Sequence, residues 1–121
     1  MMRGPLIYAA GLAFVCMAAA AAFAQSRPQF SGIASFYDKN YSGKTASGER
    51  YDGAKLTAAH KTLPFGTRLA VTNIKTHRSV TVIVNDRGPF TKGRVLDLSY
   101  AAALALHMQN RGLVKVIASV E

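Results

Sequence analysis

The stretch RLAVTNIKTHRSVTVIVNDRGPF, residues 68–90, carries the clearest structural signal in the sequence. Apolar residues recur at every second position at 68–73 and again at 79–85. A polar turn separates the two segments, so the pattern predicts a β-hairpin with one apolar face. The second arm runs into Asp86 and then into a Gly-Pro pair that begins at Gly88. Such a pair favours a turn, which predicts that the strand ends there.

The remaining sequence predicts further short strands and one helix. Three segments are rich in β-prone residues, at 32–37, 95–98 and 113–120. Residues 56–63 fit either a short helix or an irregular strand. Ser99 is a suitable N-cap for an Ala- and Leu-rich helix at 100–108, with Gly112 as its stop. Small β-rich domains of this kind commonly close into barrels, because closure removes exposed strand edges.

Residues 1–24 have the features of a secretory signal peptide. Arg3 supplies a positive start, residues 6–23 are almost wholly apolar, and Ala-Phe-Ala at the end predicts cleavage after Ala24. A retained membrane anchor is the alternative, since the apolar run approaches the length needed to span a bilayer. The single cysteine, Cys16, lies inside this run behind a Phe-Val pair. We therefore expect no lipid attachment at Cys16.

Residues 25–31 are expected to form a short polar lead-in, and residues 32–121 a single domain. The formal net charge of the chain is +9, which favours polyanionic partners. For an exported protein these include acidic lipids and the carboxylate-bearing polymers of a cell wall. The export signal and the lack of a recognition motif argue against nucleic acid. No cysteine follows the leader, which excludes thiolate metal sites and cysteine nucleophiles.

Carboxylate chemistry remains, and Asp86 is its first candidate. Strict alternation places Asp86 on the same side of the strand as the preceding valines, at the mouth of an apolar barrel, with Arg87 pointing away. An acid that is partly withdrawn from water there suits a general acid. The alternative is structural, with Asp86 accepting backbone N–H groups in the turn.

Three further residues have a functional and a structural interpretation. Glu49 lies in a long Gly-rich loop, where most glutamates are simply solvated. His60 follows two alanines and could be satisfied by the backbone. Asp97 lies between two leucines of a predicted strand, so we expect it to be buried and hydrogen-bonded in a structural role. Residue types and spacing leave these alternatives open.

Five segments, in this order and spacing, resemble those of the RlpA-like proteins of the bacterial envelope. They are GIASFY (32–37), KTASGERYD (44–52), LTAAHKTLPFGTRLAVTN (56–73), VNDRGPF (84–90) and VLDLSYAAALAL (95–106). The resemblance runs from about Gly32 to Val120. It implies a mainly β fold, namely a six-stranded double-psi β-barrel with one or two short helices.

The resemblance also implies an endolytic lytic transglycosylase that cleaves MurNAc–GlcNAc β-1,4 bonds in peptidoglycan glycan strands and forms 1,6-anhydroMurNAc. Matching positions make Asp86 the expected acid/base, Glu49 a second catalytic acid and His60 an orienting group. The residues expected to bind substrate are Tyr37, Thr45, Ser47, Arg87 and Phe90. We expect no metal and no cofactor, a monomer, and a location in the periplasm or cell envelope without stable membrane insertion after cleavage.

Two other functions fit the same barrel. A non-catalytic, expansin-like module would bind the wall and create no new glycan ends. An inverting glycoside hydrolase would need two carboxylates roughly 6.5–9.5 Å apart to admit a water molecule. The products formed from glycan strands distinguish all three.

Overall fold

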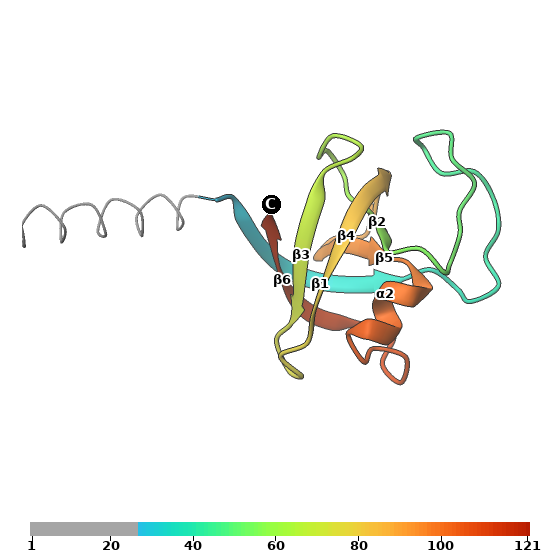
Figure 1. Ribbon diagram of the computed structural model, residues 1–121. Coiled ribbons are helices and arrows are strands. Elements are labelled where there is room, and N and C mark those ends of the chain that lie inside the picture. The colour runs from blue at the N-terminus through green and yellow to red at the C-terminus, as the bar shows by residue number, and fades with distance from the viewer. Residues whose placement is uncertain (1–26) are drawn as a thin grey trace, which may run out of the picture.

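The computed structural model describes residues 27–121 (Figure 1). The expected signal peptide and its cleavage point lie outside the described residues. The elements in chain order are β1 (Gln29–Phe36), β2 (Thr57–Ala59), β3 (Arg68–Asn73), β4 (Ser79–Asp86), β5 (Arg94–Leu98), α2 (Tyr100–Ala105) and β6 (Val114–Val120). Within the described part of the chain, no helix is long and apolar enough to cross a membrane.

The six strands form one closed barrel in the order β1-β5-β2-β4-β3-β6. β1 pairs with β5, and β2 with β4, in parallel. The other four pairs are antiparallel. Closure pairs every strand on both sides, so that no edge is left open.

The apolar residues that alternate along the strands fill the barrel. On β3 and β4, the side chains of Leu69, Val71, Val82 and Val84 are all 0% exposed. Their polar neighbours face outward, as expected for strands with one buried face. The hydrophobic core also takes in Ala102 and Ala103 of α2, with Leu106 and Met108 just after it.

Asn73, at the end of β3, links the β3–β4 turn to the segment after α2. Its side chain is 1% exposed and donates from Nδ2 to the Leu106 carbonyl at 2.8 Å. Its Oδ1 accepts the Lys75 N–H at 2.9 Å. A buried amide with both ends bonded holds these two segments together.

The predicted hairpin is confirmed, but several boundaries differ from prediction. β1 begins at Gln29, so residues 29–31 belong to the barrel and not to a lead-in. Residues 56–63 contain a strand of three residues, β2. Ser99 caps α2 as predicted, its side chain accepting the Ala102 N–H. The helix ends at Ala105 and not at 108, because His107 takes a left-handed conformation with φ of 57°.

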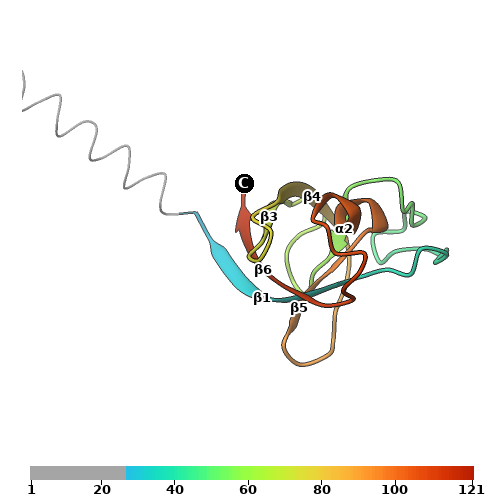
Figure 2. The same cartoon turned by 90° about the horizontal axis from the view of Figure 1, so that it is seen from below.

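The segment between β1 and β2 projects from one end of the barrel, away from the C-terminus (Figures 1 and 2). Tyr51 anchors it to the start of α2. The Tyr51 side chain is 7% exposed, and its hydroxyl accepts the Tyr100 N–H at 3.1 Å. The Gly53 carbonyl accepts the Ala101 N–H at 2.9 Å. The long loop is therefore fixed to the start of α2.

Candidate active site

Asp86 lies on the outer face of the barrel wall, contrary to the prediction from strict alternation. Ala58 pairs with Val84, but Ala59 pairs with Asp86, so Asn85 is an extra residue in β4. Ala58 and Val84 belong to the core, and Ala59 faces the opposite way. One inserted residue moves every following side chain to the other face of a strand. Asp86 therefore projects away from the inward valines.

All of the hydrogen-bonding partners of the Asp86 carboxylate come from neighbouring segments or the following turn. Oδ1 accepts the backbone N–H groups of Ala46 and Arg87, both at 2.8 Å. Oδ2 accepts the Tyr37 hydroxyl at 2.5 Å. Asp86 thus fills the structural role of a turn cap and also holds the long loop. Within residues 27–121, no backbone N–H donates a hydrogen bond to Oδ2.

Tyr37 is held between Asp86 and an aromatic cluster. Burial, followed by the hydrogen bond to Asp86 and its charge, raises the pKa of Tyr37 well above its ordinary value. The Tyr37 ring stacks on Tyr51 at 4.5 Å between centroids, and Tyr41 packs on Tyr37 at 5.2 Å. Tyr41 is 43% exposed. Tyr37 therefore remains a hydroxyl donor beside an accessible aromatic wall.

The turn that carries Glu49 is built from its own hydroxyls and backbone. Thr45 donates from both N and Oγ1 to the Glu49 carbonyl, at 2.7 and 2.9 Å. Thr45 is 5% exposed, so its hydroxyl supports the turn. Gly48 has φ of 92°, a conformation that favours glycine. The Ser47 N–H donates to the Asn85 carbonyl at 3.2 Å, which fixes the turn to β4.

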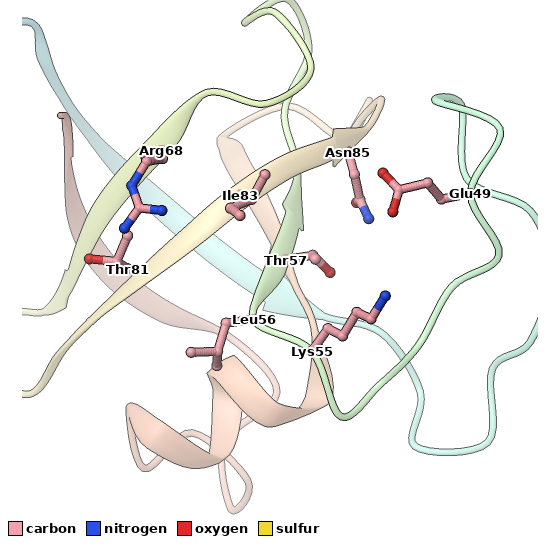
Figure 3. A pocket seen from close by; sticks show the side chains of 8 residues that line it. All are labelled: Glu49, Lys55, Leu56, Thr57, Arg68, Thr81, Ile83 and Asn85. Carbon is pink, nitrogen blue, oxygen red and sulfur yellow. The ribbon is translucent and has the colours of Figure 1, made fainter.

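The Glu49 side chain lies over the groove next to Asp86 and not against the Asp86 carboxylate. It is exposed and lines a cavity of about 610 Å³ on the outer face of β4, together with Asn85 and Lys55. Figure 3 shows the ends of these three side chains directed toward the same space. Among the described residues, no hydrogen bond joins the Glu49 and Asp86 side chains. The 44–50 turn joins the two acids, because its Ala46 N–H donates to Asp86 Oδ1 and its Ser47 hydroxyl lies 3.4 Å from Glu49 Oε1.

His60 organises the chain beyond β2. Its Nδ1 accepts the N–H groups of Thr62 and Leu63, at 3.1 and 3.0 Å. Burial, and then the charges of Arg87 and Lys61, lower the pKa of His60. The acceptor at Nδ1 leaves the proton of the neutral ring on Nε2. Within residues 27–121 the ring makes no hydrogen bond to Asp86 or Glu49, so its orienting role stays a prediction.

The lowered pKa of His60 predicts a loss of stability in mild acid. The folded protein binds fewer protons at this position than the unfolded chain does, so stability is full above the unfolded pKa of about 6.5 and falls below it. His60→Asn keeps an oxygen that can accept the Thr62 and Leu63 N–H groups. We expect Tm to fall less between pH 7.5 and 5.5 in this variant than in the parent. Equal slopes in thermal melts would contradict the assignment.

Arg87 and Phe90 follow Asp86 but point in different directions. Arg87 donates from Nη1 to the Leu63 carbonyl at 2.8 Å, and its guanidinium lies 4.1 Å from the Phe65 ring centroid. It therefore fixes the segment after β2, away from the Asp86 carboxylate. Phe90 is 81% exposed after the cis Gly88–Pro89 bond. An exposed ring next to acids is suited to stacking on a sugar.

Asp97 is a third carboxylate near Asp86, which sequence reasoning assigned only a structural role. Strand register aligns Ser35, Asp97, Ala59 and Asp86 across β1, β5, β2 and β4. Aligned residues share a face of the sheet. Ser35 donates to Asp97 Oδ1, whereas Oδ2 accepts no hydrogen bond among the described residues. The charge of Asp97 also contributes to the raised pKa of Tyr37.

The two leucines that flank Asp97 could have indicated its position from the sequence. Both belong to the core, so alternation along the strand directs the Asp97 side chain out of the barrel. Asp97 is half-buried, whereas the sequence predicted that it would be fully buried. No three His, Cys, Asp or Glu side chains within residues 27–121 are grouped so as to hold a metal ion. The candidate site is therefore a carboxylate and tyrosine site on the outer face of the barrel.

Solved structures of low sequence identity share this fold. The Streptomyces papain inhibitor superposes with a TM-score of 0.62 at 23% identity, covering 78% of this chain and 96% of that one. A Clavibacter michiganensis expansin gives a TM-score of 0.62 at 24% identity, covering 78% and 50%. These are double-psi β-barrels, which confirms the mainly β, six-stranded fold expected from the sequence.

Curated relatives are much closer in sequence. A probable endolytic peptidoglycan transglycosylase RlpA from Nostoc is 54% identical over 93 residues, covering 74% of this chain and 25% of that protein. The endolytic peptidoglycan transglycosylase RlpA from Pasteurella multocida is 53% identical over 83 residues, covering 68% and 28%. The chain thus spans about a quarter of the length of these relatives. The family model described as "Lytic transglycolase" matches residues 29–118. The chain therefore belongs to the lytic transglycolase family, as an RlpA-like double-psi β-barrel domain.

Proposed function

We propose that this domain is an endolytic lytic transglycosylase that cleaves the MurNAc–GlcNAc β-1,4 bond of peptidoglycan glycan strands. Family membership and the names of the curated relatives support the reaction class. The observation that carries the proposal for this chain is the Asp86 carboxylate. Two backbone donors fix its Oδ1, while Oδ2 accepts only the Tyr37 hydroxyl among residues 27–121. We further propose that the protein acts in the periplasm or cell envelope, as a monomer without a cofactor.

The proposed reaction needs one group that gives a proton and takes one back. Protonated Asp86 donates from Oδ2 to the glycosidic oxygen as the bond from that oxygen to the anomeric carbon breaks. The resulting carboxylate removes the proton from the MurNAc 6-hydroxyl, whose oxygen bonds to the anomeric carbon and closes the 1,6-anhydro ring. The proton balance is closed and no water is consumed. Tyr37 keeps its own proton throughout, because burial and its interaction with Asp86 raise its pKa.

Glu49 is proposed to stabilise the positive charge that develops on the sugar ring. Its exposed carboxylate at the end of the cavity beside Asn85 supports this role. Phe90 and Tyr41 are proposed to contact sugar faces, given their exposure. His60 and Arg87 are proposed to act by holding the segment after β2, through their contacts with Leu63.

The products formed from purified, peptide-free glycan strands test the proposed function. Mass spectrometry should find new 1,6-anhydroMurNAc ends. Ordinary reducing ends would instead identify a hydrolase, and the absence of any new end a binding module. The binding module is the second candidate, because the fold is shared with an expansin whose mutant was crystallised with cellohexaose.

Tyr37→Phe is expected to lower kcat by about tenfold, because the change removes the hydroxyl that orients Asp86 Oδ2. The stacked ring remains, so the thermal stability should change little. Tyr41→Phe is the matched control, since Tyr41 belongs to the same aromatic cluster but its hydroxyl does not contact Asp86. Initial rates of anhydro-end release would measure both. Equal losses in the two variants would show that the Tyr37 hydroxyl has no special role.

A further inference from the structure

A groove on the outer face of β2, β4 and β3 lies next to the candidate active site. Its floor follows the strand register, in which Thr57 pairs with Ile83 and Ile83 pairs with Arg68. The three side chains therefore share one face and lie in a row across the strands. With Leu56 and Lys55 beside them they line the cavity of about 610 Å³ (Figure 3). A space of this size accommodates a small ligand.

The groove combines apolar and cationic groups at the surface. Leu56 and Ile83 are 42% and 40% exposed, although both are large aliphatic residues. Lys55 forms no ion pair within residues 27–121, and the Arg68 Nε lies 3.5 Å from the Glu121 carboxylate in an exposed pair. Exposed pairs of this kind contribute little energy, so the Arg68 guanidinium can exchange partners. An apolar floor flanked by cations suits a ring that carries a carboxylate.

The groove is continuous with the catalytic segment. Asn85 lines the cavity and immediately precedes Asp86, and Glu49 lines the same end. Figure 3 places Arg68 at the opposite end, beyond Ile83. A chain that passes Asp86 and enters this cavity would cross Ile83 before it meets Arg68. The arrangement places carboxylate recognition beside the proposed bond-breaking site.

We propose that this groove is a subsite for the carboxylate-bearing muramyl residue of the glycan strand. The apolar side chains of Leu56 and Ile83 contact the sugar face and its acetamido methyl group. Arg68 contacts the carboxylate, which is either the free lactyl group of a peptide-free residue or a carboxylate of an attached peptide. Lys55, at the Asn85 end, adds positive charge to the same groove. The identity of the sugar rests on the proposed function.

The test measures the binding of peptide-free glycan strands to protein that also carries Asp86→Asn, so that turnover does not interfere. Lys55→Gln with Arg68→Gln should weaken binding by about tenfold or more, since the charge-assisted contact of Arg68 and the nearby positive charge of Lys55 are both lost. The matched control is Lys75→Gln with Lys115→Gln, which removes two exposed charges away from the groove. It should weaken binding by less than about threefold, as expected for long-range screened charge.

Chemical amidation of the strand carboxylates gives the complementary arm. Amidated strands should bind the unaltered groove as weakly as native strands bind the double variant, with no further loss when both changes are combined. Peptide-bearing strands identify the source of the carboxylate, because only the strand type that is recognised will be sensitive to the groove variant. Equal losses in the groove and control variants, or unchanged binding of amidated strands, would overturn the inference.

Different measurements test the subsite and the lytic reaction: strand binding tests the subsite, and anhydro-end formation tests the reaction. Groove-dependent binding without any anhydro ends from the parent protein would support the subsite and refute the lytic reaction. Anhydro ends together with unchanged binding in the groove variant would support the reaction and refute the subsite. Thermal melts of each variant check folding, which should be preserved because Lys55 and Arg68 are exposed.

Discussion

Asp86→Asn is expected to lower the release of 1,6-anhydro ends by at least about 100-fold, the range associated with loss of a general acid/base. The amide cannot give and retake the proton. Its oxygen can still accept the Ala46 and Arg87 N–H groups that the carboxylate accepts at Oδ1. The turn and the long loop should therefore stay in place, and the loss should appear in kcat and not in strand binding.

Asp38→Asn supplies the matched control for this prediction. Asp38 is an exposed acid in the same loop, and its Oδ1 accepts the nearby Asn40 N–H at 2.8 Å. Its replacement should leave the rate within about twofold, as is usual for exposed positions. Full product release by the Asp86 variant, measured by mass spectrometry, would remove Asp86 from the acid/base role and direct attention to Asp97.

Asn73→Ala is expected to cause the largest loss of stability among the changes considered, about 2–3 kcal/mol in the free energy of unfolding. The change leaves the buried Leu106 carbonyl without its Nδ2 donor and removes the acceptor for the Lys75 N–H. For a domain of this size, Tm should fall by about 10 °C or more. Denaturant or thermal unfolding measures the effect.

Asn110→Ala is the control for Asn73, because Asn110 is an exposed asparagine in the segment that follows α2. Its replacement should change the free energy of unfolding by less than about 0.5 kcal/mol. Similar losses in the two variants would mean that the bridge between the hairpin turn and the end of α2 contributes nothing specific. The rate of product release should be unaffected at temperatures where both variants are folded.

Local sequence patterns predicted those elements that are set by residues close together in the sequence. The alternation at 68–73 and 79–85 predicted the hairpin, because a half-buried strand must repeat its apolar residues every second position. Ser99 predicted the start of α2, because a cap acts on the next turn of the same chain. The predicted end of α2 was wrong. The left-handed conformation of His107 and the burial of Met108 follow from packing against the barrel.

The sequence by itself therefore determined the β3–β4 hairpin, the helix cap and, through its motifs, the family. The tertiary structure alone decided which face Asp86 occupies, since the extra residue at Asn85 appears only when β4 pairs with β2. It also decided that Asp97 lies near Asp86 and that Glu49 lines the groove next to Asp86. These relations join strands that are distant in the chain. Their register depends on pairing across the closed barrel, which no local periodicity records.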